Sequence, residues 1–127
     1  MKILHTMIRV KNIEKSLDFY TKFFDLELVQ KRRLEDCWLY FLEDKNSGFQ
    51  IELTYNDETP ENGSEIGSGV GHFAFGVESM AEFTEKLQKY NYEYLYEPLD
   101  LTGKGSLIAF VKDPDGYEIE LIENVRW

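Results

Sequence analysis

The feature that most constrains this chain is an internal repeat. Residues 48–53 read GFQIEL and residues 116–121 read GYEIEL, an offset of 68 positions (116 − 48). The only two histidines, His5 and His72, lie 67 positions apart (72 − 5). Because two independent pairs share nearly the same offset, the sequence predicts a duplication of one structural module.

Each half shows the same order of predicted elements. In the first half, hydrophobic periodicity predicts a strand at 2–10, a helix at 13–24 and strands near 26–33, 37–43 and 48–54. The second half repeats this with a strand at 70–77, a helix at 80–90 and strands near 93–97, 106–112 and 117–122. The predicted fold class is therefore α+β, with two tandem βαβββ modules in a single domain spanning 1–127. Module one covers about 1–56, a polar linker about 57–69, and module two about 70–127.

Local sequence signals predict which residues begin, end and bury the elements. The first helix is predicted to bury one apolar stripe made of Ile13, Leu17, Tyr20 and Phe24. The second helix is predicted to begin after the N-cap Ser79, with Glu82 completing a capping box. Its buried stripe would consist of Met80, Phe83 and Leu87. Residues 113–116 read DPDG, which predicts a tight turn between the last two strands.

Composition excludes several classes of function. The formal net charge of −10 would repel nucleic acid and anionic membranes, so neither is an expected partner. No apolar run is long enough to cross a bilayer, and the N-terminus does not read as a signal peptide. The single cysteine, Cys37, cannot form an internal disulfide, which indicates a reducing compartment such as the cytoplasm. Cys37 lies in a predicted strand, where a packing role is expected.

Strand alternation places one histidine and one glutamate of each half on the same kind of face. His5 and Glu52 point away from the apolar, helix-packed side of their strands, and so do His72 and Glu120. Taken singly, each is an ordinary polar residue on a strand. The recurrence of the same two residue types at the same two module positions favours a shared chemical role.

That role is predicted to be metal binding. Two neutral imidazoles and two carboxylates suit Zn²⁺, Ni²⁺, Co²⁺ or Fe²⁺, whereas Mg²⁺ would not require histidine. Four protein ligands leave room for water or a chelating substrate if the metal is octahedral. A metal bound there could act as a Lewis acid, and a neighbouring carboxylate could act as a base.

The motifs resemble bacterial glyoxalase I, or lactoylglutathione lyase, of the vicinal oxygen chelate superfamily. The likeness spans essentially the whole chain. It rests on residues 5–10 (HTMIRV), 16–20 (SLDFY), 51–56 (IELTYN), 71–74 (GHFA) and 109–123 (AFVKDPDGYEIELIE). The DPDG turn marks the superfamily, and the ELTYN run at 52–56 is more particular to glyoxalase I.

The resemblance implies a ligand set, a partner and a binding site. The metal ligands would be His5, Glu52, His72 and Glu120, with Ni²⁺ or Co²⁺ favoured and Zn²⁺ also suitable. It also implies a homodimer, with each metal site at the subunit interface completed by the complementary module of the second copy. The family's glutathione-binding arginine and asparagine match Arg9 and Asn56, which alternation places on the faces of His5 and Glu52.

The activity implied is isomerisation of the hemithioacetal of methylglyoxal and glutathione to S-lactoylglutathione. Family analogy favours Glu120 as the catalytic base, with Glu52 as a ligand and possible catalytic partner. Two alternatives stay open: another vicinal oxygen chelate metalloenzyme (a dioxygenase, epimerase or thiol transferase), and a metal-free drug-binding module. The set of two histidines and two glutamates argues against a dioxygenase, which uses two histidines and one glutamate, and against an epimerase, which typically has a glutamine among its ligands. Drug-binding modules lack the set altogether.

Overall fold

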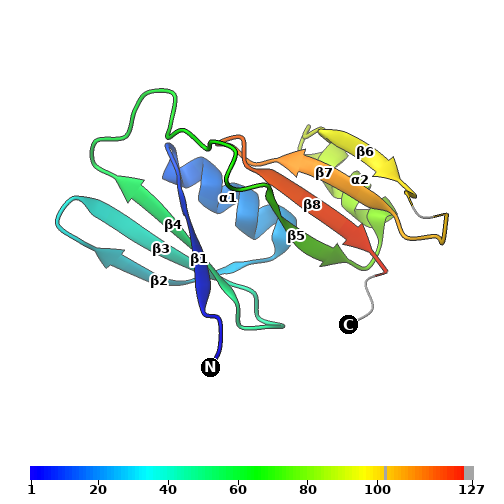
Figure 1. Ribbon diagram of the computed structural model, residues 1–127, viewed down its shortest axis with the longest axis horizontal. Coiled ribbons are helices and arrows are strands. Elements are labelled where there is room, and N and C mark those ends of the chain that lie inside the picture. Colours follow the sequence, from blue (N-terminus) through cyan, green and yellow to red (C-terminus); the bar gives the residue numbers. More distant parts are fainter. Residues whose placement is uncertain (102, 125–127) are drawn as a thin grey trace. The chain divides into compact units, whose positions relative to one another are not determined.

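The computed structural model describes residues 1–101 and 103–124. The chain divides into two compact units, residues 1–65 (unit 1) and 66–127 (unit 2). Each unit contains one helix and one four-stranded sheet, in the order β-α-β-β-β (Figure 1). The predicted α+β class with two tandem βαβββ modules is confirmed. The division between the units falls within the predicted linker, whereas the organisation of both into a single domain stays a prediction.

Unit 1 is built on a mixed sheet in the order β1-β4-β3-β2. Its elements are β1 (His5–Arg9), α1 (Ile13–Phe24), β2 (Glu27–Arg33), β3 (Cys37–Glu43) and β4 (Gln50–Asn56). β1 pairs with β4 in parallel, and the remaining neighbours pair antiparallel. The parallel pair is the structural reason that residues near both ends of the unit, His5 and Glu52, lie on adjacent strands.

Unit 2 repeats this topology in the order β5-β8-β7-β6. Its elements are β5 (His72–Val77), α2 (Met80–Lys89), β6 (Tyr96–Leu99), β7 (Ile108–Lys112) and β8 (Glu118–Glu123). β5 and β8 are the parallel pair. Element boundaries differ from the predicted ones by a few residues, most at β6, where pairing with β7 is irregular.

Helix α1 begins and ends where its polar residues cap it. The side chain of Asn12 accepts a hydrogen bond from the backbone N–H of Lys15 at 3.1 Å. Asp25 ends the helix in the left-handed conformation, and its N–H bonds the Tyr20 carbonyl. The helix contacts β2 and β4 of its own unit.

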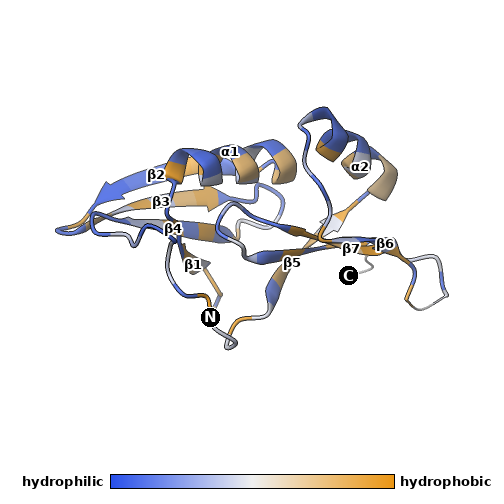
Figure 2. Cartoon of the chain, turned by 90° about the horizontal axis from the view of Figure 1, so that it is seen from above, coloured by the Kyte–Doolittle hydropathy of each residue, from blue (hydrophilic) through white to orange (hydrophobic). Residues whose placement is uncertain are grey.

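The predicted apolar stripe of α1 was partly wrong. Ile13 and Tyr20 are buried as predicted, but Leu17 and Phe24 are only half-buried. The buried face instead continues through Ser16, Phe19 and Phe23. The buried residues follow one another in steps of three and four positions, so the buried face is wider than the predicted stripe. Aromatic side chains from the neighbouring row fill this wider face. Figure 2 shows α1 with its more apolar side turned toward the sheet of unit 1.

Helix α2 matches its prediction more closely. Ser79 is the N-cap and accepts a hydrogen bond from the Glu82 N–H at 3.2 Å. Met80, Phe83 and Leu87 are its buried residues. The carboxylate of Glu123 accepts a hydrogen bond from the Met80 N–H at 2.5 Å, so β8 supplies a negative charge to the positive end of the helix.

Two other local predictions are confirmed. In the 113–116 turn, buried Asp113 accepts hydrogen bonds from the N–H groups of Asp115 and Tyr117, both at 2.9 Å, while Gly116 has φ 95°. Cys37 is a free, buried thiol on β3. In the described part of the chain, neither helix has the length and apolar character needed to cross a membrane.

Candidate metal centre

The two sheets place a histidine and a glutamate in the same relative register. In unit 1, Met7 pairs with Glu52 and His5 pairs with Gln50. Residues paired in register share a face, and so do residues two apart on one strand. His5 and Glu52 are therefore diagonal neighbours on one face of the sheet, which we call the site face of unit 1.

Unit 2 reproduces the same diagonal. Here Ala74 pairs with Glu120 and His72 pairs with Glu118 across the parallel β5–β8 ladder. His72 and Glu120 define the site face of unit 2. The duplication inferred from the repeated strings thus extends to three-dimensional register.

The histidine and glutamate side chains approach each other in both units. His5 Nε2 lies 3.9 Å from Glu52 Oε2, and His72 Nε2 lies 3.0 Å from Glu120 Oε2. The imidazoles are 41% and 44% exposed, whereas the carboxylates are 13% and 16% exposed. Within residues 1–101 and 103–124, no histidine, cysteine, aspartate and glutamate side chains gather in threes, so each unit presents a pair.

The donor chemistry of these pairs fits a divalent transition metal. Imidazole nitrogen and carboxylate oxygen are the ligands that Zn²⁺, Ni²⁺, Co²⁺ and Fe²⁺ accept readily. One pair supplies two donors, which is half of a four-ligand protein set. The two pairs contain the four residues predicted as ligands, and their joint action on one metal stays a prediction.

A phenylalanine contacts each imidazole, a feature that the sequence reasoning missed. Phe41 on β3 pairs with Glu52 and packs edge-on to His5, with ring centroids 5.7 Å apart. Phe110 on β7 pairs with Glu120 and packs edge-on to His72 at 5.3 Å. The sequence signal was present, because each phenylalanine precedes its glutamate by ten or eleven positions. Both contacts restrict the ring orientation of the histidine.

Arg9 and Asn56 meet beside the His5–Glu52 pair. An Arg9 Nη1–H donates to Asn56 Oδ1 at 2.8 Å. Both residues share the site face of unit 1, because Arg9 lies four positions after His5 and Asn56 four positions after Glu52. The structure brings together the two residues predicted to bind substrate.

Thr54 lies on β4 between Glu52 and Asn56, opposite Arg9. It is 4% exposed, and its hydroxyl has no hydrogen-bond partner among the described residues. A buried hydroxyl without a partner costs about 1–3 kcal/mol. No sequence pattern predicts this, because a threonine in a strand is ordinary.

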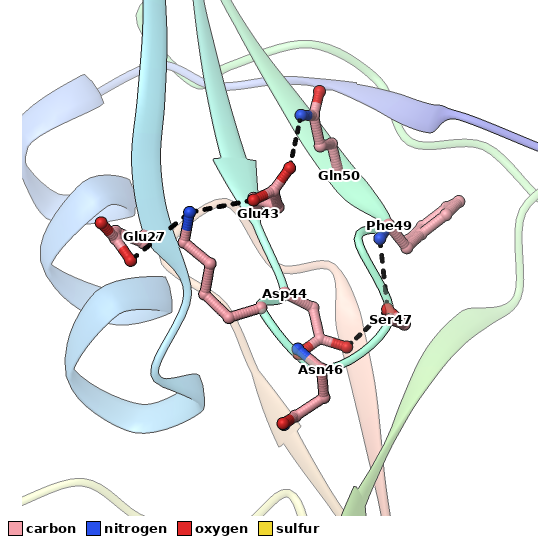
Figure 3. A network of polar contacts seen from close by, with 8 residues as sticks. Glu27, Glu43, Asp44, Asn46, Ser47, Phe49 and Gln50 are labelled. Carbon is pink, nitrogen blue, oxygen red and sulfur yellow. Dashed lines mark hydrogen bonds and ion pairs between the residues drawn. The ribbon is translucent and has the colours of Figure 1, made fainter.

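The row of the site face of unit 1 that contains His5 continues into a polar network on β4, β3 and β2 (Figure 3). Gln50 Nε2–H donates to Glu43 at 3.1 Å, and Lys45 donates to the same carboxylate at 3.0 Å. Lys45 also lies 3.6 Å from Glu27. The hydrogen bonds from Lys45 and Gln50 lower the pKa of the Glu43 carboxyl, so this row is held by charge pairs.

Unit 2 has a cavity at the corresponding place. Its volume is about 360 Å³, and it opens beside His72 at the start of β5. The lining side chains include Tyr117, Lys112 and Glu118, together with Ile66 and Val70. Lys112, Glu118 and His72 lie in one row of the ladder.

Comparison with known proteins assigns the fold. Residues 2–121 match the family model of the Glyoxalase/Bleomycin resistance protein/Dioxygenase superfamily. The chain is 38% identical to lactoylglutathione lyase of Escherichia coli O157:H7 over 128 residues, covering 97% of this chain and 93% of that protein. It is 36% identical to a lactoylglutathione lyase of Arabidopsis thaliana, covering 96% of this chain but 44% of that protein. The chain thus spans less than half the length of the plant relatives that it matches.

Solved structures agree with the sequence matches. Glyoxalase I from Zea mays superposes with a TM-score of 0.83 at 32% identity, covering 98% of this chain and 45% of that chain. The glyoxalase I of Leishmania major, described as trypanothione-dependent, gives a TM-score of 0.78 at 34% identity, covering 97% and 86%.

Proposed function

This chain belongs to the Glyoxalase/Bleomycin resistance protein/Dioxygenase superfamily, and on that premise we propose that it is a lactoylglutathione lyase (glyoxalase I). It would isomerise the hemithioacetal of methylglyoxal and glutathione to S-lactoylglutathione. The observation that carries the proposal is the recurrence of one histidine–glutamate pair, in the same register, on the site face of each unit.

The proposed ligand set consists of both pairs, His5 with Glu52 and His72 with Glu120. Family membership implies a divalent metal, and nickel or cobalt is proposed ahead of zinc. When bound, the metal supplies a Lewis acid that polarises the two adjacent oxygens of the hemithioacetal. The phenylalanines against the two imidazoles support the ligand role, because they orient the rings with their Nε2 atoms toward the carboxylates.

The proton transfer is assigned to a carboxylate of the same set. Glu120 removes the proton from C1 of the hemithioacetal and returns it to C2, so no electron donor or acceptor is needed. Its limited exposure of 16% shields the transferred proton from bulk water. Glu52 is proposed as a ligand and as the partner carboxylate.

Arg9 and Asn56 are proposed to hold a carboxylate of the thiol. The Arg9 guanidinium offers a paired donor geometry suited to a carboxylate, and the Asn56 amide can add another donor. Their mutual hydrogen bond at 2.8 Å supports the role, because it aligns Arg9 before substrate arrives. Glutathione is the thiol proposed, although the Leishmania major relative is described as trypanothione-dependent, so thiol choice varies among relatives.

The assembly proposed is a homodimer with two sites at the subunit interface. Unit 1 of one copy and unit 2 of the other would each contribute a pair of ligands. The plant relatives, which are more than twice as long as the matched segment, support this proposal, since one such chain has room for two copies. A cytoplasmic location is part of the proposal, in keeping with the free thiol of Cys37.

The test is S-lactoylglutathione formation by chelator-stripped protein given Ni²⁺, Co²⁺ or Zn²⁺ separately, with the oligomeric state measured by light scattering. We expect turnover to return with nickel or cobalt, one metal per chain, on a dimer. A folded dimer that binds metal but turns over no hemithioacetal would contradict the proposed activity. Failure to bind any of these metals would contradict the ligand set.

A further inference from the structure

Strand β2 carries three consecutive cations, and two of them are already engaged on one face of the sheet. Lys31 Nζ lies 4.4 Å from the centroid of the Trp38 ring. Arg33 makes two hydrogen bonds of 2.7 Å to the carboxylate of Asp57. Because side chains alternate along a strand, Arg32 points to the opposite face.

Register places Arg32 on the site face of unit 1. Arg32 pairs with Leu39, Leu39 pairs with Thr54, and Thr54 pairs with Arg9. These four residues therefore form one row across the sheet, adjacent to the row that contains Glu52. Arg32 is exposed and, among residues 1–101 and 103–124, makes no hydrogen bond, ion pair or ring contact.

The direction of the bound substrate follows from the proposed function, on which this inference rests. If the thiol carboxylate is held by Arg9 and Asn56 beside β1, the aldehyde-derived substituent extends from Glu52 toward β3 and β2. The wall along that path is apolar, formed by Phe41 and Leu39. Two strand steps separate β4 from β2, about 10 Å, and the path ends at the Arg32 guanidinium.

We propose that Arg32 is a specificity-determining residue that selects 2-oxoaldehydes whose apolar substituent ends in an anionic group. Phe41 and Leu39 accept the apolar body, and Arg32 pairs with the terminal carboxylate or phosphate. The chain's net charge of −10 would otherwise repel such a substrate, so a local cation has a large relative effect. The buried hydroxyl of Thr54, which has no partner among the described residues, lies in the same row between the two arginines.

The experiment compares glutathione hemithioacetals of phenylglyoxal and 4-carboxyphenylglyoxal, which differ only in the carboxylate group at the para position. The readout is the ratio of kcat/KM for the carboxylated substrate to kcat/KM for the plain one. We expect Arg32→Gln to lower this ratio at least about 10-fold, the effect of losing a hydrogen bond to a charged group. Arg32→Lys should give an intermediate ratio, because it keeps the charge but loses the forked geometry.

Lys31→Gln is the matched control, since Lys31 lies on the same strand with its charge on the opposite face. It should leave the ratio unchanged. An unchanged ratio in Arg32→Gln, or an equal fall in Lys31→Gln, overturns the inference while phenylglyoxal turnover leaves the proposed function standing.

If no hemithioacetal is turned over, a binding measurement tests the role of Arg32 separately from the proposed reaction. Calorimetry would compare S-benzylglutathione with S-(4-carboxybenzyl)glutathione on the metal-loaded protein. A preference for the carboxylated ligand that Arg32→Gln removes supports the inference without the reaction. No preference, or no binding of either ligand, overturns it.

Discussion

Units 1 and 2 share a framework but differ in what surrounds the histidine–glutamate pair. Four positions after the histidine, unit 1 has Arg9 and unit 2 has Gly76. Four positions after the glutamate both units have asparagine, but Asn56 accepts from Arg9 whereas Asn124 donates to the Gly105 carbonyl. The Arg9–Asn56 pair of unit 1, which is proposed to bind an anion, therefore has no counterpart at the equivalent positions of unit 2.

The residues paired with each histidine across the sheet also differ between the units, and here unit 2 is the more open one. In unit 1, Gln50 is tied into the network of Glu43 and Lys45. In unit 2, Glu118 and Lys112 hold those positions and line a cavity of about 360 Å³ next to His72. Each unit has a histidine–glutamate pair. The hydrogen-bonded Arg9 and Asn56 lie beside the pair of unit 1, whereas a cavity lies beside the histidine of unit 2. Under the proposed function the two units would have different roles: unit 1 would bind the thiol carboxylate, and Glu120 of unit 2 would transfer the proton.

The largest difference between the units is expected when the charge of each carboxylate is removed. Glu120→Gln should lower kcat by about 10²–10⁴-fold, because it removes the proposed general base. Glu52→Gln should lower kcat less and weaken metal binding more, since its main role is ligation. Both variants should be assayed at saturating metal, with metal affinity measured by chelator competition. A larger loss of kcat in Glu52→Gln would reverse the assignment of roles.

The sequence located the pairs because the repeat carries them. Residues 48–53 and 116–121 are similar enough to align Glu52 with Glu120, and the only histidines align at nearly the same offset. Alternation then put the two residues of each pair on one face of their sheet, as the register shows. The distance between histidine and glutamate in each pair could not be predicted from the sequence. The distances of 3.9 Å and 3.0 Å depend on which residues pair between β1 and β4, and between β5 and β8.

The next prediction concerns Arg9, the residue of unit 1 that is proposed to bind the thiol carboxylate. Arg9→Gln should raise KM for the glutathione hemithioacetal roughly 10–150-fold, the range for a hydrogen bond to a charged group, with little change in kcat. The hemithioacetal of 2-mercaptoethanol, which has no carboxylate, serves as the control and should show no such change. An equal loss with both thiols would mean that Arg9 supports the fold of the site and does not read the anion.

A smaller effect is expected from the aromatic contacts on the imidazoles. Phe110→Leu and Phe41→Leu should each weaken metal binding by about 10-fold, the lower range for residues that orient a ligand. The larger effect is expected in unit 2, where Tyr96 packs edge-on against Phe110 at 5.7 Å and fixes it, while Gln30 holds the corresponding position in unit 1. Chelator competition provides the readout, with Phe110→Tyr as the conservative control that should restore affinity.

These phenylalanines also show where sequence reasoning stopped. The neighbouring letters differ, Tyr-Phe at 40–41 and Ala-Phe at 109–110, so no shared string drew attention to them. The helix stripe failed for a related reason, because Leu17 fits the spacing of α1 but the sheet's surface admits Phe19 and Phe23 instead. Spacing predicts which residues share a face, whereas the partner surface decides which of them are covered.

The smallest effect is expected on the pH dependence of stability, which probes a tyrosine of unit 2. Tyr92 lies in unit 2, and its hydroxyl donates to the Lys112 carbonyl, next to the cavity. Burial, followed by the charge of Asp113, raises the pKa of Tyr92 to about 12. Below pH 10 the hydroxyl is protonated in both the folded and the unfolded chain, so its contribution to stability is complete.

Between about pH 10 and pH 12, the unfolded chain loses the Tyr92 proton while the folded chain keeps it, so stability falls as pH rises. Tyr92→Phe should flatten this part of the urea-unfolding midpoint plotted against pH. It should also remove one late-titrating phenol from the tyrosinate absorbance of the folded protein. The variant should be less stable than wild type at pH 8 because the Lys112 carbonyl loses its donor. If the midpoint falls as steeply in the variant between pH 10 and 12, Tyr92 is not the group that causes the loss of stability. The alkaline sensitivity would then not be confined to the cavity side of unit 2.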